Sequence, residues 1–126
     1  MHENEISEKV IGAAIEVHRT LGPGLLESVY EEALCHEFDL RGIAYKRQQF
    51  VPISYKGALL GAPLRLDLLV EEMVIVDVKA KEQLAVSDKP QLLTYLRLSK
   101  LHLGLVINFH AQLLKDGICR VVNELH

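Results

Sequence analysis

This chain of 126 residues has little of what marks a specialised class of protein. It contains only two cysteines, Cys35 and Cys119, and no C-x-x-C pair, so neither a disulfide scaffold nor a cysteine zinc site is indicated. Its six histidines show no ligand spacing, which argues against a histidine metal centre. Reduced thiols fit the cytoplasm, which is the location we expect.

Long apolar runs and an excess of basic charge are also missing. No run approaches the roughly 18 apolar residues of a membrane-spanning helix, so no membrane association is expected. The N-terminus, from Met1 to Glu5, is acidic where a secretory signal would be basic and then apolar. The net charge is -3, and the 14 Lys and Arg residues form no basic stripe typical of nucleic-acid binding. A nucleic-acid function must therefore depend on a specific site.

What is present is the composition of an ordinary globular protein. Hydrophobic residues make up 49% and charged residues 25% of the chain, which predicts a packed core. The length suits one domain and is too short for two well-packed ones. We find no repeat, linker or low-complexity tract, and we expect residues 1–126 to form a single domain.

Two helices are predicted at the N-terminal end. From Ile6 to Leu21, apolar residues recur at the spacing of one helix face. Gly22-Pro23-Gly24 ends this helix, and a second is predicted over 25–41 with Gly42 as its C-terminal cap. The short break predicts a helical hairpin.

After this hairpin the periodicity changes from that of helices to that of strands. Pro52 favours an edge or bulged position for the first strand, and Lys56-Gly57 supplies a turn. Ser87 or Asp88 can cap a third helix. The predicted elements are strands over 43–55, 64–70, 74–80 and 103–109, a helix from about 87 to 100, and an optional short strand over 117–122. This order is typical of an α/β or α+β fold with helices packed on a mixed sheet.

The central hairpin brings two carboxylates together. Side chains alternate along a strand, so two rows each share one face: Leu64, Leu66, Leu68 and Val70, and Val74, Val76, Val78 and Ala80. A three-residue loop over 71–73 aligns these rows by pairing residues 70 and 74. Asp67 then lies across from Asp77 with Cβ atoms about 5 Å apart, and Lys79 projects on the same face.

Two carboxylates this close repel each other, and apolar neighbours make their ionisation costlier. Mg²⁺ would compensate, because it prefers carboxylate oxygens and is usually held by one or two of them with waters and a substrate phosphate. Lys79 could then orient or help deprotonate a water and offset charge on a phosphate. Alternatively, Lys79 and Arg65 merely neutralise the aspartates on a solvated sheet face. The spacing leaves both interpretations open.

Asp67 followed by Asp77-Val78-Lys79 resembles the signature of the PD-(D/E)XK nuclease superfamily. The run Gly24-Leu25-Leu26-Glu27-Ser28-Val29-Tyr30 matches the motif of the GxxExxY protein family, a small bacterial and archaeal branch of that superfamily. The resemblance extends through Leu21–Gly24, Arg65–Val70, Gln91–Leu96 and Ile107–Phe109.

The resemblance implies a restriction-endonuclease-like αβββαβ core, a mixed sheet flanked by helices, with an additional N-terminal helix. It implies that Asp67, Asp77 and Glu27 hold Mg²⁺ or Mn²⁺, that Lys79 is the catalytic lysine, and that Gln91 supports the substrate or the lysine. It also implies a nucleic-acid substrate, DNA rather than RNA. The chain departs from the signature at two positions: Leu66 replaces a proline, and Asp77 stands where glutamate is common, which shortens one ligand by a methylene.

Some roles have alternatives. Glu27 lies in the first turn of its helix, where the helix dipole alone would stabilise a carboxylate, but the family motif favours the site. Tyr30 is expected to be a buried, hydrogen-bonded tyrosine rather than a catalytic phenol. Gln91 and Tyr95 share a helix face, and only Gln91 is assigned to the site. The alternative function is a catalytically silent module that binds nucleic acid or protein. Because the core is small, sequence recognition would require a homodimer or a partner.

Overall fold

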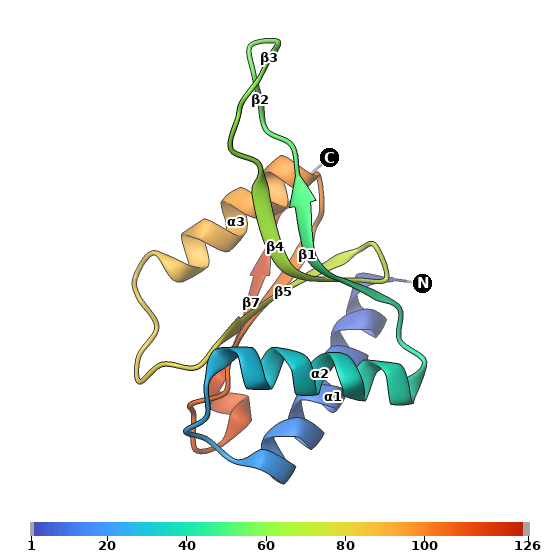
Figure 1. Cartoon of the computed structure of the whole chain (residues 1–126), viewed down its shortest axis with the longest axis vertical. Coiled ribbons are helices and arrows are strands. Elements are labelled where there is room, and N and C mark those ends of the chain that lie inside the picture. The colour runs from blue at the N-terminus through green and yellow to red at the C-terminus, as the bar shows by residue number, and fades with distance from the viewer. Residues whose placement is uncertain (1, 125–126) are drawn as a thin grey trace.

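The computed structural model of the chain describes residues 2–124 (Figure 1). Its helices and strands follow one another in almost the order that the sequence predicts. The elements are α1 (Glu3–Leu21), α2 (Glu27–Arg41), β1 (Tyr45–Val51), β2 (Ser54–Tyr55), β3 (Ala58–Leu59), β4 (Leu64–Val70), β5 (Val74–Lys79), α3 (Asp88–Ser99), β6 (Leu103–Asn108), a 3-10 helix η1 (Leu114–Gly117) and β7 (Ile118–Val122). Gly42 caps α2 with a φ of 70°, in the left-handed region predicted for it.

Five strands form one mixed sheet in the order β1-β4-β5-β6-β7. Neighbouring strands are antiparallel except β5 and β6, which run parallel and are connected through α3. β1 lies at an edge of the sheet, as Pro52 predicts. The α+β class, the mixed sheet and the αβββαβ core are therefore confirmed, with α1 added before that core. Within residues 2–124, no helix is both long and apolar enough to cross a membrane.

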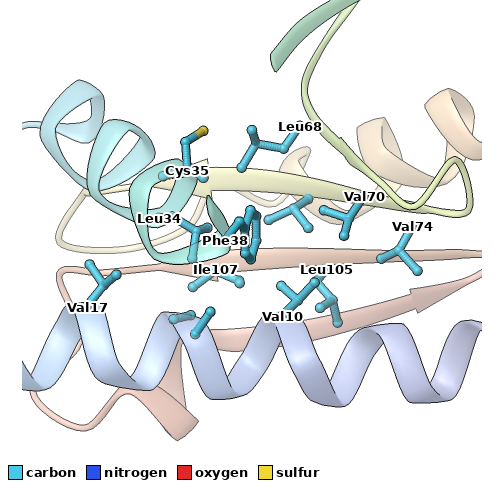
Figure 2. Packing of buried hydrophobic residues seen from close by; sticks show 14 of the residues in the cluster. Val10, Val17, Leu34, Cys35, Phe38, Leu68, Val70, Val74, Leu105 and Ile107 are labelled. Atoms are coloured by element: carbon cyan, nitrogen blue, oxygen red, sulfur yellow. The ribbon is translucent and has the colours of Figure 1, made fainter. Parts of the chain in front are cut away.

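Helices cover both faces of the sheet. α1 and α2 pack on one face through a large cluster that includes Val10, Phe38 and Leu105 (Figure 2). α3 packs on the other face through a smaller cluster that includes Leu92 and Leu96. Because helices cover both faces, β5 and β6 are buried along almost their whole length.

The apolar side chains of β4 do not all lie on one face of the sheet. Leu68 and Val70 pack into the cluster under α1 and α2, whereas Leu64 and Leu66 pack into the cluster under α3. The prediction that all four share one face is therefore wrong, because the strand changes faces at Asp67. The register of β1 on β4 puts Gln48 opposite this point, and Gln48 has a φ of 54°. This left-handed residue adds a local twist that parity along a regular strand does not include.

Beyond this point the chain forms an arm, defined here as residues 50–66, which projects from the sheet (Figure 1). The strand predicted over 43–55 is in fact two, β1 and β2, separated at Pro52. β3 was not predicted, because two residues are too short to show a period. The turn at Lys56-Gly57 is confirmed, with φ values of 47° and 84° that suit a two-residue hairpin.

Candidate active site

The hairpin of β4 and β5 has the predicted register. Val70 pairs with Val74 and Leu68 with Val76, which places Asp67 opposite Asp77. Backbone pairing stops at Leu68, and instead the Asp67 Oδ2 accepts a hydrogen bond of 3.0 Å from the main-chain N–H of Val78. The carboxylate thus satisfies a donor that the diverging strand leaves free, and this bond fixes Asp67 against β5.

Asp77 is buried and lies within hydrogen-bonding reach of Asp67. Burial raises the pKa of the Asp77 carboxyl to about 7, and the hydrogen bond and charge of Asp67 act in the same direction. The nearby Lys79 ammonium lowers this pKa but does not offset the burial. The Asp77 carboxyl is therefore costly to ionise beside Asp67, at a position where a cation would compensate the charge.

Lys79 completes this group of three. Its Nζ lies 3.4 Å from Asp77 Oδ1, on the face of the sheet that the sequence predicts. Burial lowers the pKa of Lys79, but the charges of Asp77 and Glu27 outweigh burial, so the pKa is raised overall. Lys79 is therefore a cation, suited to orienting a water and stabilising negative charge rather than to accepting a proton.

The two other predicted residues lie farther out. Glu27 is the first residue of α2 and is exposed. Partial burial raises the pKa of the Glu27 carboxyl. The charge of Lys79 lowers this pKa and the charge of Asp67 raises it, so Glu27 interacts electrostatically with both residues. Gln91 is exposed in the first turn of α3. Among the described residues, no hydrogen bond or ion pair joins Glu27 or Gln91 to the group formed by Asp67, Asp77 and Lys79.

Tyr30 holds the turn from which Glu27 projects. Its hydroxyl donates to the carbonyl of Gly22 and accepts from the N–H of Leu25 at 3.1 Å. Its ring is fully buried and stacks on Phe109 with centroids 4.7 Å apart. The prediction of a buried, hydrogen-bonded tyrosine is confirmed, and the phenol fixes the start of α2.

Sequence reasoning missed Asn108, which holds the chain just after Lys79. Its side chain donates to the carbonyl of Lys81 at 2.8 Å and accepts from the N–H of Lys81 at 3.1 Å. The next residue, Phe109, donates its N–H to the carbonyl of Lys79 at 2.9 Å. A buried amide at the end of an apolar strand was the available signal, because such a group needs partners.

A second missed group joins α2 to the sheet beside Asp67. Glu31, which is buried, accepts hydrogen bonds from Gln48 Nε2 at 2.8 Å and from Arg47 Nε at 3.0 Å. The signal was the spacing of Glu27 and Glu31, which puts them on one face of α2. This group fixes α2 relative to β1.

A divalent cation fits the aspartate pair. Among residues 2–124, no three His, Cys, Asp or Glu side chains lie close enough to share a metal ion. Mg²⁺ does not need three, because one or two carboxylates with waters and a substrate phosphate complete its shell. Asp67, which is half-buried, and Asp77, which is buried, offer such a donor set. The place of Glu27 among the ligands stays a prediction.

Comparison with known proteins agrees with this geometry. A family model, that of the PD-(D/E)XK nuclease superfamily, matches residues 4–121. No curated protein and no solved structure matches the chain. The narrower resemblance to the GxxExxY family stays a prediction.

Proposed function

Because the chain belongs to the PD-(D/E)XK nuclease superfamily, we propose that it is a Mg²⁺- or Mn²⁺-dependent nuclease. Enzymes of this superfamily generally hydrolyse phosphodiester bonds. The observation that carries the proposal is the pairing of Asp67 with the buried Asp77, with Lys79 Nζ 3.4 Å from Asp77 Oδ1. A solvated sheet face, the structural alternative for this trio, would not bury Asp77 or raise its pKa.

In this proposal Asp67 and Asp77 hold the metal ion, and Glu27 contributes from the start of α2. A bound ion would supply a water of lowered pKa and would neutralise charge on the phosphate. Lys79 would orient the attacking water and stabilise the negative charge that develops on the phosphate oxygens. Gln91 supports the substrate or Lys79 from α3. DNA is the proposed substrate, in preference to RNA.

The proposal also includes the domain organisation, the oligomeric state and the cellular compartment of the protein. Residues 1–126 form a single domain, and this domain recognises its substrate as a homodimer or together with a partner. Cys35 and Cys119 are both free thiols, which suits a reducing compartment such as the cytoplasm.

The test is cleavage of labelled single- and double-stranded DNA and RNA with Mg²⁺ or Mn²⁺. We expect Lys79→Ala and Asp77→Ala each to reduce cleavage by about 10²-fold or more, since the first removes the cation that stabilises the developing charge and the second removes a ligand of the metal ion. Lys9→Ala, at an exposed lysine of α1, is the matched control and should cleave like the wild type.

Circular dichroism of all three variants shows whether any loss comes from unfolding. Cleavage that persists in both site variants would overturn the assignment of these residues. If the folded wild type cleaves no substrate with either metal, the protein is instead a silent binding module.

A further inference from the structure

One long stretch of this chain carries charge of a single sign. Between Asp39 and Asp67 there is no Asp or Glu, although the chain as a whole has more acidic than basic residues. The stretch contains five basic residues: Arg41, Lys46, Arg47, Lys56 and Arg65. Such an asymmetry favours contact with a polyanion at this part of the surface.

The structure shows which of these charges are free for a ligand. Carboxylates pair with three of them, through the ion pairs Arg41–Glu37, Lys46–Glu72 and Arg47–Glu31. Within residues 2–124, no carboxylate forms an ion pair with Lys56 or Arg65. Both belong to the arm, at its tip and at its base.

The arm also exposes several large apolar side chains close to its two unpaired cations. Phe50 is 59% exposed, Tyr55 61% and Leu59 72%. Phe50 pairs with Arg65 across β1 and β4, so the two side chains share a face. Because Leu64 and Leu66 pack toward α3, that shared face points away from α3. At the tip, Lys56 Nζ lies 5.4 Å from the ring centroid of Tyr55.

The arm is continuous with the candidate active site. Arg65 comes two residues before Asp67 on β4, which is about 7 Å along a strand. β4 changes faces between these two residues, so Arg65 lies on the face opposite the aspartate pair, and a nucleic acid held at Asp67 reaches Arg65 by passing over the base of the arm.

We propose that the arm binds the nucleic-acid segment that flanks the scissile phosphate. Arg65 and Lys56 contact its phosphates, and Phe50 and Tyr55 provide flat surfaces on which unpaired bases stack. This inference rests on the proposed nuclease function and adds where the substrate lies on the protein.

Binding without cleavage tests it. Fluorescence anisotropy with a labelled single-stranded 20-residue DNA, in EDTA and over a range of salt, gives both the affinity and its salt dependence. The double variant Lys56→Gln/Arg65→Gln should weaken binding about tenfold and lower the slope of log affinity against log salt by about one for each cation. A change in packing alone would not alter that slope.

Two control variants match the test variants. Lys9→Gln/Lys115→Gln removes two exposed lysines outside the arm and should leave the slope near that of the wild type. Phe50→Ala/Tyr55→Ala should weaken binding to single strands more than to a duplex, whereas Leu40→Ala, at an exposed leucine of α2, should change neither.

The outcomes distinguish a failure of the arm inference from a failure of the proposed nuclease function. If the wild type binds and cleaves but the arm variants bind equally well with the same slope, the arm inference alone is wrong. If the wild type is dimeric in sedimentation and Phe50→Ala/Tyr55→Ala makes it monomeric without changing DNA binding, the arm is a self-association surface. If the wild type binds no nucleic acid, the nuclease proposal and the arm inference both fail.

Discussion

The Asp67 carboxylate has two roles that depend on one position in β4. It accepts the N–H of Val78 where the backbone pairing of β4 and β5 ends, and it contacts the buried Asp77. The hydrogen bond from the Val78 N–H stabilises the Asp67 carboxylate without a metal ion. The contact with Asp77, by contrast, makes it costly for both carboxyls to be ionised at the same time. The local structure thus keeps a charged pair whose repulsion a metal ion would relieve.

This pair predicts a pH-dependent stability of the metal-free protein. The pKa of Asp77 is about 7 when folded and near 4 when unfolded, so folding retains a proton that the unfolded chain releases. Below pH 4 both states are protonated and stability is unaffected; as pH rises from 4 to 7, the folded state loses stability, on the order of 4 kcal/mol.

We expect Asp77→Asn in EDTA to remove most of this loss, because an amide carries no proton to release. In urea unfolding at pH 4.5, 6 and 7.5, the free energy of unfolding of the variant should increase relative to that of the wild type as the pH rises. Asp116→Asn, at an exposed aspartate, is the control. A difference between Asp77→Asn and the wild type that stays constant over this range would contradict the buried proton.

Among the elements, the junction of β6, η1 and β7 shows how loops support the site. Asn108 at the end of β6 fixes Lys81 through two hydrogen bonds. Gly117, the last residue of η1, lies directly against this strand end, because a Cβ there would be 2.3 Å from the Asn108 carbonyl oxygen. Only glycine allows so close an approach between two main chains.

Gly117→Ala is therefore expected to destabilise the fold by about 1–3 kcal/mol in urea unfolding, because the main chain of Asn108 must shift. Gly61→Ala is the matched control, since nothing lies within 4 Å of its Cβ position and its backbone is not left-handed. That control should be neutral or slightly stabilising, by about 0.5 kcal/mol. Equal stability of the two variants would contradict the close approach at Gly117.

The elements also show where periodicity predicts structure and where it does not. The loop over 71–73 set the register of β4 on β5, because its length alone decides which residues pair. The change of faces at Asp67 was not predictable, because it follows the left-handed Gln48 on another strand. Gln48 in turn is held by Glu31 of α2, 17 residues away in sequence.

The complete fold places the aspartate pair in the sheet, next to the base of the arm, and close enough to the start of α2 for Glu27 to sense the charges of Asp67 and Lys79. Each part is held separately, by Tyr30 on Phe109, by Asn108 on Lys81 and by Glu31 on Gln48. A ligand that joins the two aspartates binds the folded chain and not the unfolded one. Metal binding should therefore stabilise the fold as a unit.

We expect Mn²⁺ at 100 times its Kd to add about 2.7 kcal/mol to the free energy of unfolding. In a domain of this size that raises the Tm by roughly 10 °C. Asp67→Asn, which keeps an oxygen to accept the Val78 N–H, should fold but show little increase with Mn²⁺. An equal Tm increase in Asp67→Asn and the wild type would contradict metal binding at the pair.

The sequence is sufficient for those features that depend on near neighbours. Periodicity predicts the order of helices and strands, the left-handed cap at Gly42 and the turn at Lys56-Gly57. Loop length predicts that Asp67 faces Asp77 with Lys79 beside them. These features follow from backbone geometry over a few residues, which any compact fold of this chain must respect.

Packing between distant segments decides the remaining features. The stacking of Tyr30 on Phe109, the bonds of Asn108 to Lys81 and the change of faces in β4 join residues far apart in sequence. No local pattern encodes such contacts, because their energy exists only once both segments are buried together. For the same reason the sequence names Glu27 and Gln91 as candidates, while their distance from the aspartate pair depends on how α2 and α3 pack on the sheet.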